Sequence, residues 1–128
     1  KREESWREAI VGQSQDIFVV EDDAIPVGIL TIGASRDEDV EAGITGEIWG
    51  IYLIQERWRS GIGTRVMGEA ERILSARGFT QLTLWVFEEN ANARRFYEAV
   101  GYQPDGGRKT LERGKVLGVV RYRKMINP

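Results

Sequence analysis

The spacing of apolar and polar residues divides the N-terminal half of the chain into a helix, three strands and one long loop. The capping-box pattern Ser5-Trp6-Arg7-Glu8 is followed by apolar positions at helical spacing and predicts a short helix that ends near Gly12. Three apolar, β-branched runs predict strands, of which the first two form an antiparallel hairpin. These strands cover 17–20, 27–32 and 47–54, and an acidic, glycine-containing loop covers 35–46.

The C-terminal half alternates between the helical and the extended period. Two runs of apolar residues at helical spacing predict helices, and a glycine after each run predicts its C-terminal cap. These runs are Val66, Ala70, Ile73 and Leu74 before Gly78, and Ala93, Phe96, Tyr97 and Val100 before Gly101. Strands are predicted at 79–87 and, as a pair joined through Arg113-Gly114, within 108–125. The order α-β-β-β-α-β-α-β-β indicates a single mixed α/β domain over residues 1–128.

Composition changes this picture mainly by what it excludes. The 128 residues contain no Cys and no His, which rules out thiol nucleophiles, disulfides, Ser-His-Asp triads and Cys- or His-ligated metals. Proton transfer near neutral pH must therefore use a carboxylate, a phenol, an amine or water. A net charge of -2 argues against a general nucleic-acid surface, and no apolar run is long enough for a membrane span. We expect a cytoplasmic protein without a metal, nucleic-acid or membrane partner.

The stretch 56–64 joins the third predicted strand to the following helix and contains Gly61 and Gly63. A glycine-containing turn of this kind presents unpaired backbone N–H groups, reinforced by the helix dipole, to an anion. Arg57 and Arg59 would add positive charge beside it. The pattern predicts a site for a phosphorylated cofactor, although glycine is also common in turns that have a purely structural role.

Two familiar phosphate-binding loops do not fit this stretch. A Walker A loop requires Lys followed by Ser or Thr after its last glycine, whereas Thr64-Arg65 follows Gly63. A dinucleotide fingerprint requires a third Gly or Ala at the position of Val66. The segment Trp58-Arg59-Ser60-Gly61-Ile62-Gly63 instead resembles the acetyl-CoA loop of the GNAT superfamily of N-acetyltransferases, which runs Arg/Gln-x-x-Gly-x-Gly/Ala. Trp58 departs from that pattern at its first position.

A second motif lies one predicted strand further along the chain. The run Asn90-Ala91-Asn92-Ala93-Arg94-Arg95-Phe96-Tyr97-Glu98-Ala99-Val100-Gly101-Tyr102 resembles the second GNAT signature, Asn-x-x-Ala-x-x-Phe-Tyr-x-x-x-Gly-Phe/Tyr. Two motifs in the family's order and spacing are much more specific than either alone. The resemblance implies a GNAT-like acyl-CoA N-acyltransferase fold over nearly the whole chain. It leaves out the family's first strand and helix, which would precede Lys1.

The resemblance implies catalytic roles for two side chains. Tyr97 would protonate the departing CoA thiolate, a task that suits a phenol with an ordinary pKa of about 10. The alternative for Tyr97 is a buried aromatic residue whose hydroxyl finds a partner. Glu47 lies where some GNAT enzymes place the general base that deprotonates the amine, directly or through water. The alternative for Glu47 is a solvated residue at the start of its strand.

The resemblance also implies where acetyl-CoA would bind. The third strand would part from its neighbour, so that backbone groups of Tyr52 and Leu53 pair with the pantetheine amides as an added strand would, and Gly50 is consistent with such an opening. Loop amides would hold the pyrophosphate, and Asn90 would bond the pantetheine arm, cap its helix, or do both. The complete predicted cofactor set is Tyr52, Leu53, Arg57, Arg59, Ser60, Gly61, Ile62, Gly63, Thr64, Asn90, Asn92 and Tyr97.

The resulting hypothesis is an acetyl-CoA-dependent N-acetyltransferase in which a primary amine, on a small molecule or a protein, attacks the thioester directly in a ternary complex. No enzyme nucleophile is needed, which agrees with the absence of Cys and His. A CoA-binding regulatory module without catalysis and a nucleotide-binding domain are the alternatives. The acidic run Asp37-Glu38-Asp39-Val40-Glu41 would attract a cationic amine or simply face solvent. A homodimer remains open.

Overall fold

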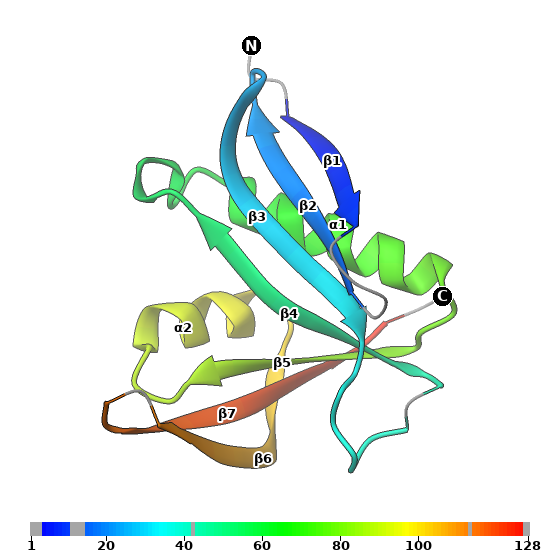
Figure 1. Cartoon of the computed structure of the whole chain (residues 1–128), viewed down its shortest axis with the longest axis vertical. Helices are drawn as coiled ribbons and strands as arrows, with labels where there is room; N and C mark the ends of the chain where they lie inside the picture. Colours follow the sequence, from blue (N-terminus) through cyan, green and yellow to red (C-terminus); the bar gives the residue numbers. More distant parts are fainter. Residues whose placement is uncertain (1–3, 11–14, 42, 113, 127–128) are drawn as a thin grey trace.

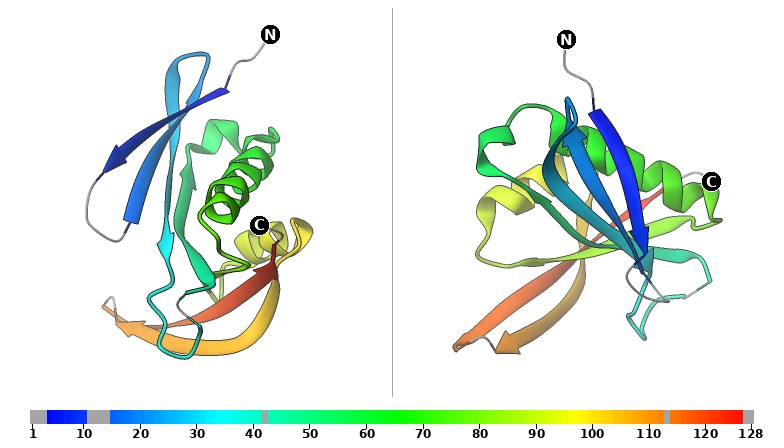
Figure 2. Two further views of the ribbon diagram at one scale, coloured as in Figure 1. Left: turned by 90° about the vertical axis from the view of Figure 1, so that its right-hand side faces the viewer. Right: turned by 45° about the horizontal axis from the view of Figure 1, so that its top comes forward.

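The computed structural model describes residues 4–10, 15–41, 43–112 and 114–126. Within these residues, seven strands form one mixed sheet in the order β1-β2-β3-β4-β5-β7-β6, and two α-helices pack on the same face of it (Figure 1; Figure 2). The strands are β1 Glu4–Ile10, β2 Gln15–Asp22, β3 Ile25–Ala34, β4 Thr45–Leu53, β5 Gln81–Phe87, β6 Gln103–Glu112 and β7 Val116–Met125. The helices are α1 Ile62–Ala76 and α2 Ala91–Ala99, and a short 3-10 turn, η1, covers Gln55–Arg57.

The apolar core lies between the sheet and the helices. Helix α1 contributes residues spaced by three or four positions, because this spacing places them on one stripe of the helix. These residues are Ile62, Val66, Met67, Ala70 and Leu74. Leu82 and Leu84 of β5 are buried in the same cluster, and Phe96 of α2 packs at its edge. The predicted helical runs are confirmed, and Gly78 and Gly101 follow them with φ angles of 95° and 102°. No helix in the described part of the chain is both long and apolar enough to cross a membrane.

The N-terminal helix predicted from Ser5 to Gly12 is wrong. Residues Glu4–Ile10 form β1, which pairs antiparallel with β2 from Glu4 opposite Asp22 to Ile10 opposite Asp16. A capping box reports local preference alone, and a helix this short gains few backbone hydrogen bonds. The edge of β2 offers hydrogen-bonding partners along the whole segment, so tertiary pairing overrides the local signal. Gly12 lies outside the described residues.

The other predicted elements are present, with longer boundaries at several ends. The hairpin of β2 and β3 turns at Asp23 and Ala24, whose φ angles of 54° and 68° are typical of a two-residue turn that matches the twist of its strands. Both β4 and β6 begin earlier than predicted. Arg113, in the predicted turn between the last two strands, lies outside the described residues, whereas Gly114 has the φ of 78° that a turn glycine permits.

Strands β4 and β5 run parallel but pair over the first part of their length alone. Their register ends at Ile48 opposite Leu84, whereas β4 continues to Leu53 and β5 to Phe87. Helix α1 makes the crossover between the two strands, and α2 follows β5. The predicted parting of the third predicted strand from its neighbour is therefore confirmed. It leaves the later residues of β4 free of a β5 partner on that side.

The face of the sheet away from the helices carries a buried polar cluster centred on Arg121. Its guanidinium donates to Asp105 at 2.7 Å, to Asp39 at 2.8 Å and to Asp37 at 3.1 Å. The indole of Trp85 also donates to Asp37. The hydrogen bond from Arg121 holds the pKa of Asp39 below its usual value. Asp37 and Asp39 of the acidic run are thus tied to the sheet by ion pairs, which neither sequence-based alternative described.

Replacing Arg121 with Met should lower the free energy of unfolding by about 3 kcal/mol, because buried carboxylates would lose their compensating charge. The side chains of Asp37 and Asp105 are each 11% exposed, and Arg121 is 4% exposed. Urea denaturation at neutral pH measures the change. The matched control is Arg72→Met on the surface of α1, where loss of the solvent-exposed ion pair with Glu69 should leave the free energy of unfolding nearly unchanged. Equal losses in the two variants would contradict a dominant role for the buried cluster.

Candidate functional site

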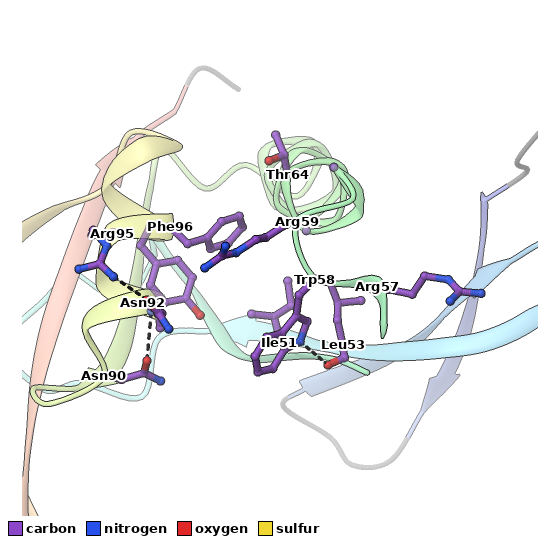
Figure 3. A pocket seen from close by; sticks show the side chains of 14 residues that line it. Ile51, Leu53, Arg57, Trp58, Arg59, Thr64, Asn90, Asn92, Arg95 and Phe96 are labelled. Carbon is purple, nitrogen blue, oxygen red and sulfur yellow. Dashed lines mark hydrogen bonds between the residues drawn. The ribbon is translucent and has the colours of Figure 1, made fainter. Parts of the chain in front are cut away.

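A cleft of about 560 Å³ opens where β4, the N-terminus of α1 and α2 meet. This volume is typical of small-molecule and cofactor sites, and the walls combine apolar with cationic side chains (Figure 3). The lining residues are Ile51, Leu53, Arg57, Trp58, Arg59, Gly61, Gly63, Thr64, Asn90, Asn92, Ala93, Arg95, Phe96 and Tyr97. Most of the predicted cofactor residues are among them, whereas Tyr52, Ser60 and Ile62 are not. Within the described ranges, no group of acidic side chains is arranged to hold a metal ion.

The glycine loop leads directly into α1 and leaves the first N–H groups of the helix open. Gly61 precedes the helix with a φ of 87°, a left-handed conformation that favours glycine. No side chain caps this end, and Arg65 donates its N–H to the Gly61 carbonyl. The N–H groups of 62–64 therefore have no partner within the helix. Together with the helix dipole, they favour an anion at this point.

The two arginines of the loop point in different directions. Arg57 donates from Nε to the Asp22 carboxylate at 2.9 Å, and its side chain runs away from the cleft (Figure 3). Arg59 is exposed, and its side chain extends toward α2 (Figure 3). On α2, Arg95 also lines the cleft and donates to Asn92. Arg59 and Arg95 are therefore the cations placed to meet a phosphate. Arg95 was not predicted because it occupies an unspecified position of the second motif.

Ser60 and Ile62 support the loop from behind the wall of the cleft. The Ser60 hydroxyl donates to the backbone oxygen of Arg57 at 2.5 Å. The side chain of Ile62 is fully buried in the core. Ile62 can therefore offer a ligand its backbone N–H but not its side chain.

Backbone orientation along β4 favours Ile51 over Tyr52 as a contact for a ligand. In an antiparallel ladder, both backbone groups of alternate residues point to the same neighbouring strand. Ile54 donates its N–H to Val27 at 2.9 Å, so Tyr52 also directs its backbone groups to β3. Ile51 and Leu53 direct theirs to the opened side, where both line the cleft. The side chain of Tyr52 is 61% exposed and lies outside the lining.

Trp58 forms part of the wall through a hydrogen bond to the same strand. Its indole Nε1–H donates to the Leu53 carbonyl at 2.9 Å, and Figure 3 shows the ring beside Ile51 and Leu53. The side chain nevertheless remains 58% exposed. The indole therefore lies against the opened edge of β4 without being buried there.

Helix α2 brings the second motif to the cleft. Asn90 caps the helix, because its Oδ1 accepts the Ala93 N–H at 3.1 Å, and it also lines the cleft. Phe96 packs against the core, as its helical position predicted, and approaches Gly63 of α1. A Cβ at Gly63 would lie 3.3 Å from the Phe96 ring. The absence of a side chain at Gly63 thus lets the two helices close on the cleft together.

Tyr97 presents its phenol to the cleft, and within the described part of the chain its hydroxyl has no hydrogen-bonding partner. Burial raises the pKa of Tyr97 to about 12, so the hydroxyl stays protonated at neutral pH. The ring lies 5.4 Å from that of Phe96 and 6.4 Å from that of Tyr102, measured between centroids. A positioned, protonated phenol of this kind can act as a general acid.

Glu47 lies outside the cleft lining, on the other face of the sheet. Its neighbour Gly46 faces the helix side, where an added Cβ would meet Leu82, and successive strand residues alternate between faces. The Glu47 side chain is 1% exposed, accepts the Arg36 N–H at 3.0 Å and pairs with the Arg36 guanidinium at 2.7 Å. It is therefore not the solvated residue of the alternative interpretation. Nor does the structure bring it into one cleft with Tyr97.

The model of the acetyltransferase (GNAT) family matches residues 1–102 of the chain. The chain belongs to this family. The matched residues include the glycine loop, the opened strand pair and the whole second motif. The fold and the family predicted from the two motifs are thereby confirmed.

Relatives of the GNAT family support the same assignment. The uncharacterized N-acetyltransferase YuaI of Bacillus subtilis is 32% identical over 104 residues, which cover 80% of this chain and 56% of the relative. The chain thus spans about half the length of these curated relatives. A GNAT-family acetyltransferase from Streptococcus pneumoniae has a TM-score of 0.71 at 22% identity, covering 89% of this chain and 68% of that one. YncA of Salmonella typhimurium, solved with its cofactor acetyl-CoA, has a TM-score of 0.73 at 16% identity, covering 88% and 65%. At these identities the two structures support the fold alone.

The GNAT loop of this chain differs from the family pattern at Trp58. Trp58 stands where the pattern has Arg or Gln, and it places an indole donor on Leu53 rather than a polar side chain beside the anion site. Arg59, the next residue, has a positive φ of 60° and an exposed side chain. Arg59, the residue after Trp58, therefore supplies positive charge at the loop.

Replacing Gly61 with Ala should destabilise the protein by about 1 kcal/mol, because a left-handed φ strains any residue that has a Cβ. An added Cβ at Gly61 meets nothing within 4 Å, so backbone strain is isolated from steric clash. The control is Gly68→Ala in the exposed interior of α1, which also meets nothing and should stabilise by about 0.5–1 kcal/mol. Urea denaturation of both variants measures the difference. A stabilised Gly61→Ala variant would show that the loop is not held in this conformation.

Proposed function

We propose that the protein is an acetyl-CoA-dependent N-acetyltransferase. One observation carries the proposal: the open N–H groups of α1, the opened edge of β4 and the free phenol of Tyr97 converge on a single cleft of cofactor size. The residues present fit acetyl-CoA as a co-substrate. Arg59, Arg95 and the N–H groups of 62–64 suit its phosphates, and Ile51 and Leu53 offer backbone groups to its amide-containing arm.

The proposed reaction is direct acetyl transfer in a ternary complex. The amine nitrogen attacks the thioester carbonyl carbon, and the tetrahedral intermediate expels the CoA thiolate as the C–S bond breaks. Tyr97 gives its proton to that sulfur, because a phenol with a raised pKa is fully protonated at the start of the step. The amine attacks in its neutral form and loses one N–H proton as the intermediate collapses to the amide, and water returns a proton to the Tyr97 phenolate. No covalent enzyme intermediate is required, in keeping with a chain that has neither Cys nor His.

Glu47 is the proposed acceptor of the amine proton, through water. It precedes Ile48, at which the pairing of β4 with β5 ends, and it lies on the face opposite the cofactor cleft. A second hollow of about 300 Å³ lies at the end of β5 and is lined by Phe87, Glu89, Asn90, Leu117 and Gly118. Asn90 lines both spaces. An amine that approaches from this hollow would therefore meet a cofactor bound from the helix side, with Glu47 on the amine's own face.

A CoA-binding regulatory module without catalysis is the second candidate. Two observations favour it: Trp58 already occupies the Leu53 carbonyl, and Glu47 is already paired with Arg36. For the catalytic candidate, the proposed acceptor is a primary amine on a small molecule or a protein. We also propose a cytoplasmic location and assembly as a homodimer.

Two measurements separate these candidates. Calorimetry should give tighter binding of acetyl-CoA than of ATP or NAD, because neither nucleotide carries an arm that can pair with β4; the reverse order would favour a nucleotide-binding domain. A thiol-release assay over a panel of small amines and peptide amines should then yield free CoA with at least one acceptor. Binding of acetyl-CoA without amine-dependent thiol release across the panel would favour the regulatory module.

Replacing Tyr97 with Phe should lower kcat by about 100-fold while the KM for acetyl-CoA changes little, because one proton donor is lost and the ring is kept. In the unaltered enzyme, kcat should show no alkaline decline from Tyr97 below about pH 11, because burial raises its pKa to about 12 and the acid form persists until then. The thiol-release assay measures both. Tyr52→Phe, whose side chain lies outside the cleft, is the control. Equal kcat in Tyr97→Phe and the parent would remove Tyr97 from the mechanism.

A further inference from the structure

The Leu53 carbonyl is a hydrogen-bond acceptor on the opened edge of β4. The ladder between β4 and β5 ends at Ile48, and the alternation along β4 directs the backbone groups of Leu53 away from β3. Leu53 also lines the cleft. An extended ligand that contains amide groups could therefore pair with this edge as an additional strand would. Such pairing requires that the carbonyl be free to accept a ligand N–H.

In this structure the carbonyl already has a donor. The indole Nε1–H of Trp58 bonds it at 2.9 Å (Figure 3), so the side chain of the loop takes the position at which a ligand amide would donate. A carbonyl oxygen has two lone pairs, but the indole body also lies beside Ile51 along the same edge (Figure 3). A ligand arm that follows the strand would meet the ring as well as the donor.

We propose that Trp58 is a displaceable gate over the opened edge of β4, which the amide-containing arm of acetyl-CoA must move aside in order to bind. The inference rests on the proposed function, because it takes acetyl-CoA as the ligand of the cleft. It gives the replacement of the family's Arg or Gln by Trp58 a definite effect, which is weaker binding of the amide-containing arm of acetyl-CoA. The nucleotide part of the ligand, which faces the α1 N-terminus and Arg59, does not compete with the indole.

Because Trp58 is exposed, moving its indole away from β4 costs little free energy. Its side chain is 58% exposed, so solvent can accept the indole N–H once the ring has moved, and little apolar contact is lost. The net effect is the exchange of one hydrogen bond at Leu53 for another. Removing the indole donor should therefore tighten the binding of a ligand that uses this carbonyl by roughly two- to tenfold.

The test compares Trp58→Phe with the parent by calorimetry on two ligands. Acetyl-CoA carries the amide-containing arm, whereas adenosine 3′,5′-bisphosphate carries the nucleotide part without it. The variant should bind acetyl-CoA roughly two- to tenfold more tightly, because Phe cannot donate to Leu53, and it should bind adenosine 3′,5′-bisphosphate as the parent does.

The matched control is Trp49→Phe. The indole of Trp49 also donates to a strand carbonyl, that of Ala34 at 3.3 Å, but it lies outside the cleft lining. Its removal should leave both affinities unchanged. Urea denaturation of both variants checks that each is folded, which distinguishes a lost gate from a damaged loop.

Each other outcome overturns the inference. Unchanged acetyl-CoA affinity in Trp58→Phe means that the indole does not compete with the ligand. Weaker binding of both ligands means that Trp58 is a platform for the nucleotide. If the parent binds adenosine 3′,5′-bisphosphate but not acetyl-CoA, or binds neither, the proposed function fails and the gate fails with it. If the parent binds acetyl-CoA and Trp58→Phe binds it no better, the gate alone fails.

Discussion

The parting of β4 from β5 after Ile48 is the constraint on which the site depends. Parallel strands joined by a helical crossover normally stay paired along their length, and their backbone groups are then unavailable to a ligand. Here both strands continue beyond the last pair, so one edge of β4 faces open space while its other edge remains held by β3. The N-terminus of α1 and one side of α2 border that opening. In the proposed function, backbone groups at this opening would serve both the phosphates and the amides of acetyl-CoA, with Arg59 and Arg95 adding positive charge at the phosphates.

The sequence predicts the family and most of the fold because the informative signals are local and redundant. The glycine loop, the periodicity of α1 and the Asn90–Tyr102 run each predict an element on their own, and their order excludes other assignments. The helix prediction for the N-terminal segment is wrong for the opposite reason. Its capping box is a single local signal, and pairing with the edge of the next strand, β2, which that motif does not encode, decides its conformation.

The site was predictable down to the segments but not to the directions of individual side chains. Arg57 and Arg59 look equivalent in the sequence, yet Asp22 of β2 withdraws the first from the cleft. The choice between Tyr52 and Ile51 depends on the parity of the β3–β4 ladder, which a bulge between Thr31 and Ile32 sets. Such distinctions arise from register and from partners far along the chain. A linear motif records neither.

The contact between Gly63 and Phe96 links two segments that are separate in the sequence. Each belongs to a different motif, yet the space that one leaves is filled by the ring of the other. A larger residue at position 63 would be tolerated if position 96 became smaller, and neither change would be neutral alone. The sizes of the residues at positions 63 and 96 are therefore coupled. Related chains should change these two positions together, even where the sequence of the strand between the two motifs varies.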